Sequence, residues 1–221
     1  MSVRIRHLTN EDIPAASALQ ADVYESIPAF AGEQFAGLLQ RFPQGQFAAE
    51  IDGRLAGISL SLVVLWDDYS LHHSWADVTN EGHFDTHVPS GRTLYGAEVC
   101  VDQAARGLGI GHALYDARRK LCTAMNLKRI IAGGRLPGYH HYATQFPPEE
   151  YAKRIIWGDI YDPVLRFQLD EGFDYCGILH GYLPTDIDSV GNAALIVWLN
   201  RAYDEAQPTH LPAPNFLENA V

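Results

Sequence analysis

The chain has 221 residues, and its 27 acidic residues outnumber its 16 lysines and arginines, which gives a formal net charge of −11 at pH 7. Hydrophobic residues make up 47% of the sequence and charged residues 19%, a balance that is typical of a globular protein and excludes a largely disordered one. The acidic excess argues against nucleic acid or an anionic membrane as the main partner, because both require a basic face.

The cysteines and the N-terminus indicate the compartment. Cys100, Cys122 and Cys176 are odd in number and form no Cys-x-x-Cys motif, which is typical of free thiols in a reducing compartment. The first 22 residues contain no basic segment followed by an apolar one, and no run of about 18 apolar residues exists to cross a membrane. We therefore expect a cytoplasmic protein.

The first half of the chain predicts a strand, two helices and a hairpin. Alternation predicts a strand over residues 3–8, and Thr9 is placed to cap a helix over 13–23. A second short helix ends at Pro43, and the turn dipeptide Asp52-Gly53 predicts a hairpin of strands at 46–51 and 55–66. Residues 67–92 form a long insertion rich in Asp, His and Gly, and loops of this length are usually functional or mobile.

The second half predicts a strand at 93–101, a glycine-rich turn and an amphipathic helix. The apolar stripe of that helix recurs every three or four residues, at Ile110, Leu114, Ala117, Leu121 and Met125. Further elements are expected at 128–132 (strand), 163–171 (helix), 175–182 and 193–199 (strands). We expect one domain over 1–203, including the insertion at 67–92, and an extended tail over 204–221 that carries three prolines.

The segment with the most chemical information is Arg106-Gly107-Leu108-Gly109-Ile110-Gly111, where the strand turns into the helix. The first N–H groups of a helix have no partners and lie at the positive end of its dipole, so they bind phosphate. Glycines let the backbone approach such an anion. A dinucleotide fingerprint fails at His112 or Leu114, and no Gly-Lys-Ser/Thr follows to make a P-loop. The alternative is a tight turn without a ligand.

The pattern R-x-x-G-x-G resembles the acyl-CoA pyrophosphate loop of the GNAT superfamily of N-acyltransferases, and the predicted elements follow the order of that fold. Further stretches are similar to the GNAT module fused ahead of carbon–nitrogen hydrolase domains in some bacterial proteins. They lie at residues 86–87, 93–96, 130–139, 162–165, 167–169 and 181–184. The resemblance implies an α/β fold with a GNAT-like mixed, splayed β-sheet flanked by helices, and it leaves the acceptor substrate open.

The resemblance also implies where acetyl-CoA, the expected co-substrate, would bind. The backbone of Val99 and Val101 would pair with the pantetheine arm, and the strands ending at Val101 and starting at Lys128 would splay to admit it. A backbone N–H near Val99 would polarise the thioester carbonyl. The pyrophosphate would be held by the turn, namely by Arg106, Gly107, Leu108, Gly109, Ile110 and Gly111.

The same resemblance suggests the catalytic groups. Glu98 matches the position where many members carry a general base, and it would act through one water; the alternative is a solvated strand carboxylate. The usual general acid is a tyrosine four residues before a Gly-Phe pair, and that position holds Gln168, which cannot serve as an acid. The substitutes are Tyr139, Tyr142 and Tyr161, each of which is alternatively a packing aromatic. Departure of the thiolate without an acid is a further alternative.

The insertion and Arg135 leave alternatives open. The carboxylates and histidines at 67–92 match no zinc signature, so we predict no metal there, and they form either a flap that binds an amine or an ordinary solvated loop. Cys100 is expected to be a small buried side chain. Arg135 either contacts a substrate carboxylate or the pantetheine, or forms a structural ion pair.

The sequence therefore predicts an N-acetyltransferase that moves an acetyl group from acetyl-CoA to a small-molecule or peptide amine by direct attack. It would work either as a monomer or as a homodimer, and neither nucleic acid nor a membrane is expected as a partner. The alternative is a non-catalytic acyl-CoA-binding or sensing module that partners another enzyme.

Overall fold

The computed structural model describes residues 2–213 and 215–217. Within these residues the strands form one seven-stranded sheet in the order β1-β2-β3-β4-β5-β7-β6. The strands are β1 (Val3–His7), β2 (Phe47–Ile51), β3 (Arg54–Val64), β4 (Thr93–Val101), β5 (Arg129–Arg135), β6 (Asp174–Leu179) and β7 (Ala193–Leu199). The helices are α1 (Ile13–Val23), α2 (Gly32–Arg41), α3 (Trp75–Thr79), α4 (Ile110–Ala124), α5 (Pro148–Trp157) and α6 (Pro163–Asp170).

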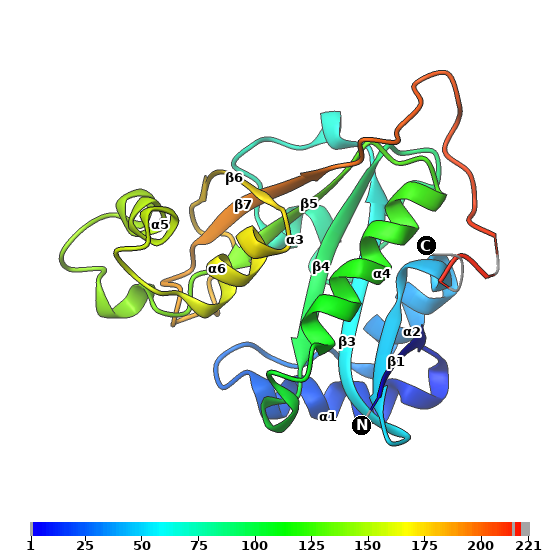
Figure 1. Cartoon of the computed structure of the whole chain (residues 1–221), viewed down its shortest axis with the longest axis horizontal. Coiled ribbons are helices and arrows are strands. Elements are labelled where there is room, and N and C mark those ends of the chain that lie inside the picture. The colour runs from blue at the N-terminus through cyan, green and yellow to red at the C-terminus, as the bar shows by residue number, and fades with distance from the viewer. Residues whose placement is uncertain (1, 214, 218–221) are drawn as a thin grey trace.

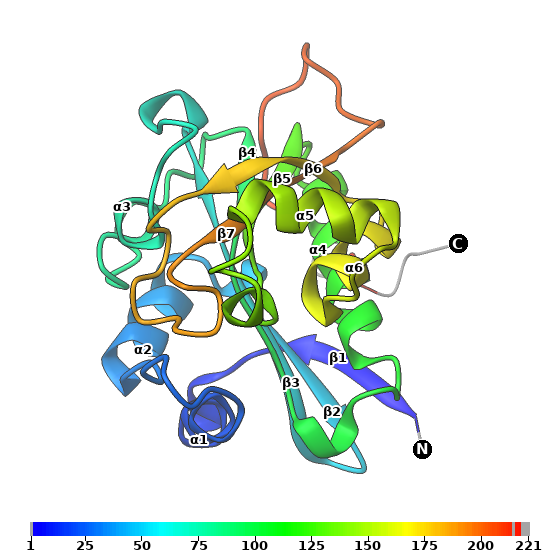
Figure 2. The same cartoon turned by 90° about the vertical axis from the view of Figure 1, so that its left-hand side faces the viewer.

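The sheet separates two layers of helices and two apolar cores. Helices α1, α2 and α3 cover one face, and α4, α5 and α6 cover the other (Figures 1 and 2). Strand β3 is buried from Ala56 to Val64, because both of its faces are covered, and its continuous apolar run is typical of such a strand. No helix in the described part of the chain combines the length and apolar character needed to cross a bilayer.

The sheet opens between β4 and β5, as the resemblance implied. These two strands pair in parallel only over Thr93–Gly96 and Arg129–Ala132. Beyond this point β4 continues along β3 to Val101, while β5 continues along β7 to Arg135. The two strands therefore diverge toward the lower part of Figure 1, and this divergence leaves one edge of β4 without a neighbouring strand.

An irregularity in the pairing of β3 with β4 sets the direction of the Glu98 side chain. Leu60 pairs with Glu98, but the next residue, Ser61, pairs with Gly96, so Ala97 is an extra residue in β4. Such a β-bulge moves the side chains that follow it to the opposite face of the sheet. Glu98 therefore lies on the face that is covered by α1, and hydrogen bonds from α1 reach its carboxylate.

The buried side chain of Arg118 in α4 holds this bulge. Its Nη2 donates to the carbonyl oxygens of Leu60 at 3.1 Å and Glu98 at 2.7 Å, and its Nε donates to Ser61 Oγ at 3.1 Å. A Cβ at Gly96 would lie 2.8 Å from Arg118 Nη1, so the guanidinium needs a glycine there. Because a bulge takes carbonyls out of the regular ladder, Arg118 supplies the donors that these buried oxygens require.

Two helices differ from the sequence expectations. No helix was predicted between the strand at 128–132 and the helix at 163–171, but α5 lies there, with Glu149 and Glu150 in its first turn and Gly158 as its C-cap. Acidic residues in the first turn and a glycine just past the last turn are ordinary helix end signals, so the sequence did contain indications of this helix. The insertion is also not wholly irregular, because it contains α3, capped by Ser74.

The C-terminal tail is tied to the domain by several contacts. The Asn126 side chain donates to the carbonyl oxygens of Asp204 and Gln207 at 2.9 and 3.0 Å. Phe216 is buried, and its ring centre lies 6.2 Å from that of Phe47. Residue 214 and residues 218–221 lie outside the described residues, and the division at residue 203 stays a prediction.

Candidate functional site

The glycine-rich turn between β4 and α4 presents free backbone donors to solvent. Gly107 and Gly109 have φ of +80° and +81°, a left-handed conformation that favours glycine. A Cβ on either residue would meet no atom within 4 Å, and residues 106–109 are exposed. The N–H groups of residues 107–111 have no acceptor within the described chain. Together these features form a site that can hold an anion.

The free edge of β4 presents the backbone of Val99 and Val101 to the opening. Asp102 N donates to Ala56 O on β3, and bonded positions alternate in an antiparallel pair. The backbone groups of Cys100 therefore face β3, while those of Val99 and Val101 face the side that β5 has left. The carbonyl oxygen of Val99 lies 3.2 Å from the Tyr24 hydroxyl.

Glu98 is partly buried and receives two hydrogen bonds from α1 and the residue that follows it. The Tyr24 hydroxyl donates to Glu98 Oε1 at 2.8 Å, and Gln20 Nε2 donates to Oε2 at 3.0 Å. Gln20 is itself oriented, because its Oε1 accepts from Phe30 N at 2.9 Å. Burial raises the pKa of Glu98 above its usual value, against the opposing effect of these hydrogen bonds, of the Arg135 charge and of the Val99 backbone N–H.

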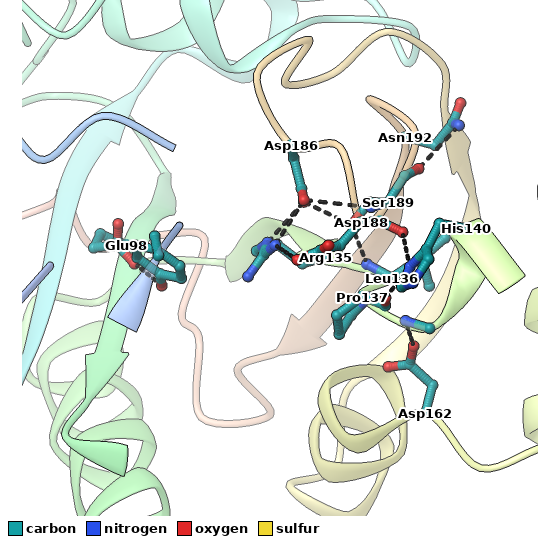
Figure 3. Close-up of polar contacts among 12 residues, drawn as sticks. Glu98, Arg135, Leu136, Pro137, His140, Asp162, Asp186, Asp188, Ser189 and Asn192 are labelled. Carbon is teal, nitrogen blue, oxygen red and sulfur yellow. Dashed lines mark hydrogen bonds and ion pairs between the residues drawn. The ribbon is translucent and has the colours of Figure 1, made fainter. Parts of the chain in front are cut away.

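Arg135, at the end of β5, forms a structural ion pair, which was one of the two alternatives (Figure 3). Its Nε and Nη2 donate to the two carboxylate oxygens of Asp186 at 2.7 and 2.6 Å, and Nη2 also lies 3.2 Å from Asp188 Oδ2. Asp186 is buried and also accepts from Ser189 Oγ at 2.6 Å. The guanidinium carbon lies 5.1 Å from the centre of the Tyr24 ring, so the ion pair also supports that ring.

The tyrosines expected as substitute acids lie away from Glu98. Tyr139 donates to Phe146 O at 3.2 Å, and its ring centre lies 5.4 Å from that of Tyr151. Tyr142 packs between Phe146 and Tyr151, and Tyr161 is 76% exposed. No contact within the described residues joins these tyrosines to Glu98, and their catalytic role stays a prediction.

Gln168 lies beside the opening, over β5. It is buried, and its Nε2 donates to Tyr115 OH at 3.1 Å. Its Oε1 has no hydrogen-bond partner among residues 2–213 and 215–217, and a Cβ at Gly134 would lie 2.1 Å from that oxygen. Because residue 134 is a glycine, the Gln168 amide can lie against β5.

Two histidines of the insertion, His73 and His87, contact different residues. His87 Nδ1 accepts from Val63 N at 3.1 Å, and burial together with the charge of Arg41 lowers the pKa of His87 to about 4. His73 is buried against Tyr95. Across the described ranges, no group of three or more His, Cys, Asp or Glu side chains is placed to hold a metal ion.

Sequence reasoning missed Gln20, Tyr24 and Asp186. Gln20 lies in α1 and Tyr24 directly follows that helix, so a glutamine on its core-facing side and a tyrosine at its end were a signal that could have been noticed. Asp186 belongs to an irregular segment between β6 and β7, and only its ion pair with Arg135 reveals it.

Curated proteins and solved structures are similar to this chain. The chain is 41% identical over 199 residues to "Probable hydrolase YhcX" of Bacillus subtilis, a match that covers 90% of this chain but only 39% of that protein. It is 33% identical over 211 residues to "Uncharacterized N-acetyltransferase YkwB" of the same organism, with 93% and 92% of the two chains covered. The structure of the GphF GNAT-like decarboxylase in complex with isobutyryl-CoA aligns with a TM-score of 0.73 and 22% identity over 89% of this chain and 98% of that chain.

The similarity to GphF is a similarity of fold, because its sequence identity is low. The match to the first relative agrees with the expected likeness to GNAT modules of hydrolases. A model of the Acetyltransferase (GNAT) family matches residues 14–146, which include β4, the glycine-rich turn and α4. The splayed sheet, the glycine-rich turn before α4 and this match agree, and the chain belongs to the GNAT acetyltransferase family.

Proposed function

We propose that this protein is an N-acetyltransferase that moves an acetyl group from acetyl-CoA to a small-molecule or peptide amine by direct attack, with Glu98 as the general base acting through one water. One observation carries the proposal. A partly buried carboxylate, held by two donors, lies on the strand that borders the opening in the sheet and leads into a turn with free N–H groups. A base, a free strand edge and an anion site on one continuous segment are what this reaction needs.

The residues around the opening fit acetyl-CoA. The N–H groups of residues 107–111 would hold the pyrophosphate, with the exposed Arg106 beside them, and the space around Gly107 and Gly109 is open. The free backbone edge of Val99 and Val101 would bind the amides of the pantetheine arm. The isobutyryl-CoA complex of the GphF structure supports an acyl-CoA as the ligand of this fold.

The chain would contribute two effects to the chemistry. The Val99 N–H, which faces the opening, would polarise the thioester carbonyl, because a fixed dipole stabilises the charge that develops on that oxygen. Glu98 would remove one proton from the amine through a water. Burial raises the pKa of Glu98, which brings its basicity closer to neutral pH, where a general base is most effective.

A non-catalytic acyl-CoA-binding module is the second candidate, and Gln168 favours it. The resemblance leads to a tyrosine acid at that position, and glutamine cannot protonate a thiolate. This candidate shares the cofactor site with the first and differs in lacking turnover.

Steady-state thiol release from acetyl-CoA over a panel of amines separates the candidates. The enzyme should release thiol only when an amine acceptor is present. The net charge of −11 favours cationic acceptors, and screening should lower the rate constant at low substrate as salt rises. Binding without thiol release would support the module, and decarboxylation of a carboxylated acyl-CoA without thiol release would contradict both candidates.

Glu98→Gln tests the base, because it keeps the shape and removes the basicity. Turnover at neutral pH should fall by roughly 10²-fold or more, the usual contribution of general base catalysis, while acetyl-CoA affinity stays the same. The deficit should shrink at high pH, where the amine is already neutral. Glu50→Gln is the control, since Glu50 is a partly buried carboxylate of β2 that pairs with Arg6. Wild-type turnover in Glu98→Gln would mean that the base lies elsewhere, and Asp67 and Asp68 would be tested next.

A further inference from the structure

The Tyr24 hydroxyl lies between two acceptors but has one proton to give. It is 2.8 Å from Glu98 Oε1 and 3.2 Å from Val99 O. A phenol donates one hydrogen bond and can accept others through its oxygen. The direction of its proton therefore depends on what the neighbouring carboxyl does.

The Gln20 amide fixes the orientation of the Glu98 carboxylate and directs its Oε1 toward Tyr24. Gln20 Oε1 accepts from Phe30 N at 2.9 Å, so the NH₂ end of Gln20 must face Glu98 Oε2, which it contacts at 3.0 Å. Oε2 therefore accepts from Gln20, while Oε1 is the oxygen that faces the Tyr24 hydroxyl. A proton carried on Oε1 can be donated to the Tyr24 oxygen, and the Tyr24 proton is then free to turn to Val99 and the opening.

We propose that Tyr24 completes the proton path of acetyl transfer, in place of the acid that Gln168 cannot be. The inference rests on the proposed function. As the amine nitrogen bonds to the acetyl carbon and the carbon–sulfur bond breaks, Glu98 takes the proton from nitrogen through the water. Glu98 Oε1–H passes its proton to the Tyr24 oxygen while the Tyr24 hydroxyl gives its own to the sulfur. The amine has lost one proton, the thiol has gained it, and both side chains are restored.

The surroundings of Tyr24 explain why it must act together with Glu98. Burial, the charge of Glu98 and the nearby Cys100 raise the pKa of Tyr24 well above its usual range, and the charge of Arg135 opposes them. A phenol with so high a pKa is a poor acid by itself. It can protonate a thiolate when it receives a proton as it gives one, because no phenolate then forms.

The ring of Tyr24 is held independently of its hydroxyl. Arg135 lies over it, with the guanidinium carbon 5.1 Å from the ring centre, and Asp186 fixes that guanidinium with two hydrogen bonds. Figure 3 shows Arg135 and Asp186 together, with Glu98 on the neighbouring strand. Tyr24→Phe therefore removes the hydroxyl and leaves the ring in place.

The test compares Tyr24→Phe with Tyr151→Phe. Tyr151 is the matched control, because it is a buried tyrosine whose hydroxyl also donates to a carboxylate, that of Asp162, at 2.9 Å. With acetyl-CoA and the best amine, Tyr24→Phe should lower kcat by roughly 10²-fold, the lower end of acid–base contributions. KM for the amine and acetyl-CoA affinity should stay the same. Tyr151→Phe should leave kcat unchanged.

Two further measurements separate a relay from a structural role. In Tyr24→Phe the carboxyl pKa of Glu98, followed by NMR of labelled glutamate, should rise, because a donor to the ionised form is lost. In the double variant with Glu98→Gln, kcat should be no lower than in Glu98→Gln alone, because residues that act as a unit are not additive.

The results of these experiments distinguish failure of the proton relay from failure of the proposed function. Wild-type kcat in Tyr24→Phe, or full additivity in the double variant, overturns the relay while Glu98→Gln still supports the proposed function. A wild-type protein that binds acetyl-CoA but turns over no amine overturns both. A fall in kcat that the matched control reproduces also refutes the relay, because it would report only the loss of a buried hydroxyl.

Discussion

Gly109→Asp should abolish much of the acetyl-CoA affinity at little cost to the fold. Gly109 has φ of +81°, and a Cβ there would meet no atom within 4 Å. The added side chain therefore causes no clash, and its folding cost is the left-handed backbone alone, about 1 kcal/mol. For a chain of this size that is about 2–4 °C in Tm. Thermal unfolding of the free protein measures this part.

The loss of affinity follows from charge. A carboxylate about 5 Å from a phosphate oxygen interacts unfavourably by about 1 kcal/mol at the dielectric of water and about 3 kcal/mol at an effective dielectric of 20. These energies correspond to about 5- to 150-fold weaker binding. Calorimetric titration with acetyl-CoA at low and high salt should show the loss, and it should shrink as salt screens the charges.

Two variants complete the experiment. Gly109→Asn keeps the shape without the charge, so its loss of affinity should be smaller and insensitive to salt. Gly158→Asp is the matched control, because Gly158 has φ of +85° and equally open surroundings but caps α5. It should lose the same stability and keep full affinity. Undiminished binding in Gly109→Asp, or an equal loss in Gly158→Asp, would refute the assignment of the turn.

Three predictions concern residues that support the candidate site, and chemical denaturation measures the free energy of unfolding of each variant. Asp162→Ala should lower the free energy of unfolding by about 3 kcal/mol, because this buried carboxylate caps α6 and also accepts from Gly138 N; no change would refute its capping role. Burial opposes ionisation of Asp186, but the hydrogen bonds of Arg135 outweigh it and its pKa lies below the usual value. The stability from this ionised group is present above about pH 4 and is lost as pH falls through the folded-state pKa. Asp186→Asn should therefore lose about 3 kcal/mol at pH 7 and show a shallower decline toward acid, and an unchanged acid slope would contradict this. Gly57→Ala should cost about 1–3 kcal/mol, because its Cβ would lie 2.8 Å from a methyl group in the core, and a neutral effect would show that the core can shift.

Local signals were enough to predict much of the fold. The hairpin turn formed where its dipeptide indicated, with φ of 50° at Asp52 and 77° at Gly53. The amphipathic helix after the glycine-rich turn also formed as its apolar period indicated, with Ile110, Leu114 and Leu121 buried. These features depend on residues within a few positions of one another, so the sequence alone contains the reason for them.

The direction of Glu98 was decided only by the tertiary structure. The bulge at Ala97 turns this side chain toward α1, and a bulge depends on the register with β3 and on the donors of Arg118, which no local pattern encodes. The partners Gln20 and Tyr24 come from 78 and 74 residues away. The sequence thus determined that a carboxylate lies on the strand before a glycine-rich turn, while packing of distant elements decided which groups contact that carboxylate.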